Sequence, residues 1–128
     1  MERKPKVLYV DDHEDYLDVI TMLLDREAIE AHGVREANLA FELAQHEDFD
    51  LYILDTWLPD VDGIELCRNL RTLNPNKPVL FYSGVTLSEV QEAALSVGAA
   101  GYVLKPDFDE LFRKVTYLIR SPPFVTAV

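Results

Sequence analysis

The stretch LYILDTWLPDVDG, residues 51–63, decides the fold class of this chain. It opens with four apolar residues in a row, a pattern typical of a strand covered on both faces, as in a parallel sheet. Asp55 follows this run directly, and the Pro, Asp and Gly residues that come next are typical of a turn. We therefore expect a buried strand over 51–54 that ends in an acid at the edge of a sheet.

Similar apolar runs occur at residues 7–10, 79–82 and 102–104, and a weaker strand is expected within residues 28–34. Apolar residues at helical spacing follow each of these strands. Strands that alternate with helices five times predict an α/β fold, with a parallel sheet that carries helices on both faces. The crossover connections of such a fold are right-handed.

Polar residues at the starts of these helices predict how some of them begin. We expect Asn38 to cap the second helix. Ser88 with Gln91, three residues later, is typical of a capping box at the start of the fourth helix, and Asp107 with Glu110 is typical of one at the start of the fifth.

Composition restricts the class of protein. A chain of 128 residues with 48% hydrophobic residues fits one globular domain. We place that domain at residues 1–121, followed by a tail or the start of a linker at 122–128. The net charge of −11 argues against a nucleic-acid-binding surface, which needs clustered Lys and Arg. No apolar stretch approaches the ~20 residues that span a bilayer, so we expect a cytoplasmic protein.

The residues that end the expected strands share a chemistry. Asp11 and Asp12 end the first strand, Asp55 the third, Ser83 the fourth and Lys105 the fifth. In open α/β sheets, ligands bind beyond the carboxyl ends of the strands. Carboxylates that lie close together repel one another, and Mg²⁺ relieves this because it binds carboxylate and phosphate oxygens. These side chains therefore predict phosphoryl transfer to a carboxylate nucleophile.

At these positions the chain resembles the receiver domains of two-component response regulators. The resemblance covers residues 7 to 119, and its marks are Val10-Asp11-Asp12, the stretch 53–63, Ser83-Gly84 and Lys105-Pro106. Each mark alone is weak, but the four together, in this order and at strand ends, are specific. The resemblance implies a doubly wound, flavodoxin-like (βα)₅ fold with strand order 2-1-3-4-5.

The resemblance also implies roles for the residues of the site. Asp55 would be the phosphoacceptor. Asp12 would bind Mg²⁺ (or Mn²⁺) directly, together with Asp55, while Asp11 would act mostly through water. The backbone carbonyl of Trp57 would complete the protein ligands.

Three further residues follow from the same resemblance. Ser83 and Lys105 would hold the phosphoryl oxygens, and the Lys105–Pro106 peptide bond would be cis. Tyr102 would be the switch aromatic, which rotates inward when Ser83 moves toward the phosphate. The surface of the fourth helix, fifth strand and fifth helix would then change its contacts.

The implied partners are a histidine kinase or histidine phosphotransfer protein upstream and a protein target or output domain downstream, with a dimer on phosphorylation. Two alternatives stay open. One is a phosphatase-like enzyme with an aspartate nucleophile, which would need a second acid where this chain has Trp57. The other is a degenerate receiver that binds its partner constitutively. We favour a signalling receiver, not an enzyme, that transfers phosphate only to and from Asp55.

Four other residues have simpler interpretations. We interpret His13 as a residue that starts the first helix, in preference to a metal ligand or a phosphohistidine, and Cys67 as buried filler. Asp60 and Asp62 are interpreted as turn and helix-start residues. Trp57 departs from the smaller or polar residue usual in the family, and we hypothesise that its side chain overhangs the site and slows hydrolysis of the acyl phosphate.

Overall fold

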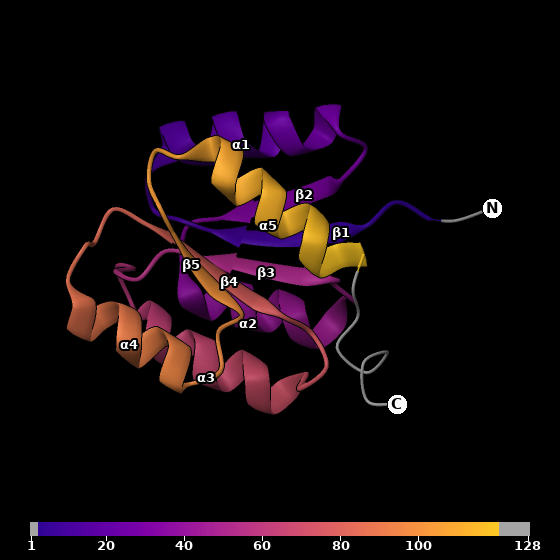
Figure 1. Cartoon of the computed structure of the whole chain (residues 1–128). Helices are drawn as coiled ribbons and strands as arrows, with labels where there is room; N and C mark the ends of the chain where they lie inside the picture. Colours follow the sequence, from indigo (N-terminus) through magenta and orange to yellow (C-terminus); the bar gives the residue numbers. More distant parts are fainter. Residues whose placement is uncertain (1–2, 121–128) are drawn as a thin grey trace, which may run out of the picture.

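A computed structural model describes residues 3–120 of the chain, in which strands and helices alternate (Figure 1). The strands are β1 (Lys6–Val10), β2 (Glu30–Val34), β3 (Leu51–Leu54), β4 (Val79–Ser83) and β5 (Gly101–Leu104). The helices are α1 (Glu14–Arg26), α2 (Ala37–His46), α3 (Gly63–Leu73), α4 (Ser88–Ser96) and α5 (Phe108–Arg120). The expected tail at residues 122–128 lies outside the described residues.

The five strands form one parallel sheet in the order β2-β1-β3-β4-β5. The predicted α/β fold and its strand order are confirmed. Val10 of β1 pairs with Leu54 of β3 at the last position of both strands. The residues that follow these two strands therefore leave the sheet side by side.

Helices cover both faces of the sheet, with α1 and α5 on one face and α2, α3 and α4 on the other (Figure 1). Successive side chains of a strand point to opposite faces. In β1, Val7 and Tyr9 accordingly belong to the core under α1 and α5, while Leu8 and Val10 belong to the core under the other three helices. Both sides of β1 need apolar residues, which explains why its sequence is continuously apolar.

Two of the predicted helix caps are wrong, although α4 does begin at Ser88 as expected. Asn38 is the second residue of α2 and does not cap it; the Asp60 carboxylate instead accepts hydrogen bonds from the backbone N–H groups of Ala37 and Asn38, both at 2.9 Å. Ser88 is the first residue of α4, and its N-cap residue, Leu87, makes no side-chain capping bond. Asp60 lies 23 residues beyond Ala37 in the sequence, so a local pattern cannot reveal this cap.

The other helix starts agree with the sequence. The Asp62 carboxylate accepts a hydrogen bond from Ile64 N at 2.8 Å and caps α3. The Asp107 carboxylate accepts one from Glu110 N at 3.0 Å at the start of α5. Cys67 of α3 is fully buried, and burial raises the pKa of its thiol to about 11, which confirms its interpretation as core filler.

Among residues 3–120, no helix is long and apolar enough to cross a membrane.

Candidate functional site

The carboxyl ends of β1 and β3 bring two acids together. Asp11 and Asp55 follow the paired residues Val10 and Leu54, and Asp55 N donates to Val10 O at 2.9 Å. Asp11 is fully buried and Asp55 is 5% exposed. Two carboxylates of neighbouring strands thus lie at one rim of the sheet with little access to water.

Lys105 is the cation that both acids share. Its Nζ lies 2.7 Å from Asp11 Oδ2 and 3.1 Å from Asp55 Oδ2, and its side chain is only 8% exposed. Its Nζ also lies 4.3 Å from the centre of the Tyr16 ring, a cation–π contact that holds the amine from a third side. Burial alone would lower the pKa of Lys105, but the bond to Asp11 and the charge of Asp55 raise it.

Asp11 has a full set of donors. Besides Lys105, the buried Tyr9 hydroxyl donates to Oδ2 at 2.6 Å and His13 N donates to Oδ1 at 2.9 Å. Burial would raise the pKa of Asp11, but these hydrogen bonds outweigh it and lower the pKa. Asp11 is therefore held as a carboxylate.

Asp55 has fewer donors than Asp11. Its Oδ1 accepts a hydrogen bond from Thr56 N at 2.8 Å, and its Oδ2 accepts one from Lys105. Burial raises the pKa of Asp55, the charge of Lys105 only partly opposes this, and the negative charge of Asp11 adds to it. Of these two buried acids, Asp55 is the one that the surrounding protein stabilises less as an anion.

Ser83 ends β4 at the same rim, as predicted, but its hydroxyl is already engaged. Ser83 Oγ lies 2.6 Å from Thr56 Oγ1 and accepts a hydrogen bond from Val85 N at 3.1 Å. The Tyr102 hydroxyl donates to Val85 O at 2.9 Å, and the Tyr102 ring stacks on Phe81. The backbone of Val85 therefore connects Ser83 with Tyr102.

Asp12 and His13 extend the acidic cluster. Asp12 Oδ1 is buried and receives no hydrogen bond within residues 3–120, although His13 Nδ1 lies 3.2 Å away. One ligand atom from each of Asp11, Asp12, His13 and Asp55 falls within 4.8 Å of the others. Three carboxylates, of which two share one lysine, and a buried oxygen without a donor fit a divalent cation.

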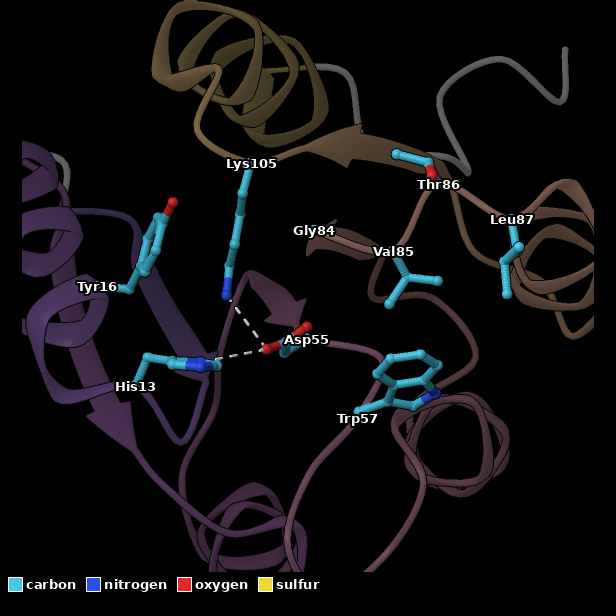
Figure 2. A pocket seen from close by; sticks show the side chains of 9 residues that line it. All are labelled: His13, Tyr16, Asp55, Trp57, Gly84, Val85, Thr86, Leu87 and Lys105. Atoms are coloured by element: carbon cyan, nitrogen blue, oxygen red, sulfur yellow. Dashed lines mark hydrogen bonds and ion pairs between the residues drawn. The ribbon is translucent and has the colours of Figure 1, made fainter.

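An open pocket of about 620 Å³ leads to Asp55. Figure 2 shows Lys105 and His13 approaching the Asp55 carboxylate from two sides, with the Trp57 ring beside it. The Trp57 side chain lines this pocket and is 61% exposed. The Lys105–Pro106 peptide bond is cis.

Four neighbours of the predicted site residues were not identified from the sequence: Tyr9, His13 as part of the cluster, Tyr16 and Thr56. One signal existed for Tyr9, because residues i and i+2 of a strand share a face and Tyr9 precedes Asp11 by two. Tyr16 lies three residues after His13, a spacing that places both on one side of α1. Thr56 has no comparable signal in the sequence.

Comparisons with known proteins agree with this fold. The family model described as the response regulator receiver domain matches residues 7–116. The transcriptional regulatory protein CusR of Escherichia coli K12 is 33% identical over 90% of this chain and 51% of its own length. The response regulator ArlR of Staphylococcus saprophyticus is 29% identical over 92% of this chain and 54% of its own length. The chain thus spans about half the length of these curated relatives.

Solved structures give the same result. The receiver domain of the Francisella response regulator 1452 is 30% identical, with a TM-score of 0.84 over 91% of this chain and 97% of that one. A CheY-like receiver domain from Methanospirillum hungatei is 27% identical, with a TM-score of 0.88 over 91% of this chain and 94% of that one.

Proposed function

Because the chain belongs to the response regulator receiver domain family, we propose that it is a phosphorylation-dependent signalling switch in which Asp55 accepts the phosphoryl group. The observation that carries the proposal is the convergence of Asp11, Asp55 and Lys105 at one rim, with Lys105 Nζ 2.7 Å and 3.1 Å from the two carboxylates. A buried carboxylate beside a fixed amine is suited to receive an anionic group.

The transfer forms one bond and breaks another. A carboxylate oxygen of Asp55 forms the O–P bond while the P–N bond to the imidazole of a phosphohistidine breaks. The electron pair of that bond returns to the imidazole nitrogen, which then takes up a proton. Lys105 would donate to the phosphoryl oxygens and so offset the charge that arrives on Asp55.

A divalent cation, Mg²⁺ or Mn²⁺, fits the remaining donors. We propose that Asp12, Asp55 and the backbone carbonyl of Trp57 hold it directly and that Asp11 acts through water. The cation supplies positive charge that offsets the charge of the phosphoryl oxygens. Support comes from Asp12 Oδ1, a buried oxygen that has no hydrogen-bond donor among residues 3–120.

The signal would leave the site through Ser83 and Tyr102. If Ser83 turns from Thr56 toward a phosphoryl oxygen, its bond with Val85 N must change, and Val85 O is the acceptor of the Tyr102 hydroxyl. This shared residue supports a relay from Ser83 to Tyr102, and from there to the surface formed by α4, β5 and α5.

The partners follow from the same proposal. The phosphoryl donor is a histidine kinase or a histidine phosphotransfer protein. The signal passes downstream to a protein target or an output domain. A dimer on phosphorylation, a cytoplasmic location and no direct contact with nucleic acid are part of the proposal, the last because the chain carries a net charge of −11.

The central test uses one substitution at each end of β3. Wild-type protein incubated with a small acyl phosphate and Mg²⁺ should gain the mass of one phosphoryl group, without continued turnover of phosphate esters. Asp55→Asn should gain none, because an amide cannot form the acyl phosphate. Asp50→Asn is the matched control at the opposite rim and should react as the wild type does. Phosphorylation of Asp55→Asn at the full rate would contradict the proposal.

Trp57 is proposed to prolong the phosphorylated state. Its exposed ring lines the pocket beside Asp55, where it would hinder the approach of water to the acyl phosphate. Trp57→Asn should therefore speed the loss of the phosphoryl group, with phosphorylation itself retained. The decay is followed by intact mass after the donor is removed, and an unchanged decay rate would refute this role.

A further inference from the structure

His13 directs an imidazole nitrogen into the carboxylate cluster. Its Nδ1 lies 3.1 Å from Asp11 Oδ1, 3.2 Å from Asp12 Oδ1 and 3.9 Å from Asp55 Oδ2. Figure 2 shows the ring turned toward the Asp55 carboxylate, on the side away from Trp57. The ring therefore reaches all three acids of the proposed cation site.

The position of His13 at the start of α1 does not by itself account for this orientation. His13 is the N-cap residue of α1, but its side chain makes no capping hydrogen bond. Its backbone N–H donates to Asp11 Oδ1 at 2.9 Å, which fixes the backbone beside the acids. Although the side chain is 64% exposed, its Nδ1 lies at hydrogen-bond distance from Asp11 Oδ1, 3.1 Å, and its ring packs edge-on against Tyr16, so the ring faces the cluster.

The spacing of Asp12, His13 and Asp55 suits a shared ion, with Asp11 close enough to act through water. Their ligand atoms lie within 4.8 Å of one another. Metal–ligand bonds of about 2.0–2.2 Å place two ligands of one ion roughly 3 to 4.4 Å apart, so only small side-chain adjustments are needed. One nitrogen with several carboxylate oxygens is a donor set that differs from the all-oxygen set Mg²⁺ prefers.

We propose that His13 Nδ1 is an additional ligand that makes this site bind divalent transition metals of the zinc class, in competition with Mg²⁺. Imidazole binds Zn²⁺, Ni²⁺ and Co²⁺ well, whereas Mg²⁺ gains little from a nitrogen donor. The proposal rests on the cation site of the proposed function. It assigns to His13 a part in the choice of metal, beyond its place at the start of α1.

The test measures metal binding to the unphosphorylated chain at neutral pH by titration calorimetry with Zn²⁺ and, separately, with Mg²⁺. We expect His13→Gln to weaken Zn²⁺ binding by about tenfold or more and to change Mg²⁺ binding by less than about twofold. Wild-type protein saturated with Mg²⁺ should require more Zn²⁺ to fill the same site.

A matched control removes a different histidine. His46→Gln should leave both affinities unchanged, because the His46 ring lies against the carbonyl of Glu42 in its own helix. In the wild type, Zn²⁺ should also shift the ring resonances of His13 in the NMR spectrum, and by more than Mg²⁺ shifts them. This second measurement needs no variant.

Equal or tighter Zn²⁺ binding by His13→Gln, or His13 resonances that Zn²⁺ leaves in place, would overturn the inference. Failure of the proposed function has a different signature. If the wild type bound no Mg²⁺, the proposed cation role would fail, whereas Zn²⁺ binding that is independent of His13 would overturn only the metal preference.

Discussion

An aspartate lies at each end of β3, and the two aspartates have opposite surroundings. Asp50 precedes the strand and accepts three hydrogen bonds, two from the Arg3 guanidinium at 2.9 Å and 3.0 Å and one from Lys6 N at 2.8 Å. Asp55 follows the strand, accepts bonds only from Thr56 N and Lys105 within the described part of the chain, and shares Lys105 with Asp11.

The pKa values of the two groups differ in direction for this reason. Burial would raise the pKa of Asp50, but the Arg3 and Lys6 bonds outweigh it and lower the pKa. At Asp55, burial prevails and the pKa is raised. The charge of Asp50 is balanced by its donors, whereas the charge of Asp55 is only partly balanced. Additional positive charge at Asp55, from a bound cation, would therefore be favourable, and the same cation could offset the charge of a phosphoryl group.

The largest effect on stability is expected from a substitution at Gly63, which packs against the backbone that follows β3. A Cβ atom at Gly63 would overlap the backbone carbonyl oxygen of Asp55. Gly63→Ala should therefore displace Asp55 or the start of α3 and lower the free energy of unfolding by roughly 3 kcal/mol, a typical cost of overpacking. Denaturation by urea, followed by circular dichroism, measures it.

Gly84→Ala is the matched control for this variant. Gly84 lies at the same rim after β4, and a Cβ atom there meets no atom within 4 Å. Its free energy of unfolding should stay close to that of the wild type. If Gly63→Ala were as stable as Gly84→Ala, the backbone around Asp55 could move to accommodate a Cβ atom at little cost, and the prediction would be wrong.

A smaller effect tests the comparison between Asp50 and Asp55 directly. Replacing Asp by Asn should change the free energy of unfolding in opposite directions at the two ends of β3. Asp50→Asn should lower the free energy of unfolding by ~1–2 kcal/mol, since it weakens bonds with a partly exposed arginine. Asp55→Asn should raise it by ~1 kcal/mol in metal-free protein, because it removes one of the crowded charges while Lys105 stays paired with Asp11. Urea denaturation with a chelator measures both.

Adding Mg²⁺ and lowering the pH should change the stability difference between Asp50→Asn and Asp55→Asn. Mg²⁺ should stabilise the wild type and reduce the advantage of Asp55→Asn, since a ligand stabilises the state that binds it. Asp50 has a folded pKa below its ordinary 3.8, so its contribution is present above pH 3.8 and is lost as pH falls through the folded value. The deficit of Asp50→Asn should therefore shrink in acid. Equal signs for the two variants would contradict the comparison.

Much of the fold was predictable from local patterns. The apolar runs at residues 51–54 and 79–82 identified strands buried on both faces, because burial on both sides leaves no polar position within a strand. The two wrong caps, at Asn38 and Ser88, fail differently, because α4 has no side-chain cap at its N-cap residue, Leu87, whereas α2 has a distant one. The cap of α2 comes from Asp60, a residue that only the folded chain brings near.

Some residues of the candidate site were likewise predictable from the sequence, and others were not. Asp11, Asp55, Ser83 and Lys105 were identified because parallel strands bring their carboxyl ends to one rim, which the order of elements already implies. The contacts of His13, Tyr9 and Thr56 were not, because they depend on how side chains orient over a few ångströms.

The sequence by itself determined the layered fold and the rim on which the acids gather. The pattern of apolar residues identifies strands and helices without knowledge of where each side chain lies in space. Only the tertiary structure decided how many donors each acid receives. Hydrogen bonds and ion pairs act over about 3 Å and depend on direction. Asp50 and Asp55, alike in type and both next to β3, therefore differ only once the chain is folded: Asp50 is neutralised by Arg3, and Asp55 is left with a shared lysine and a histidine nearby.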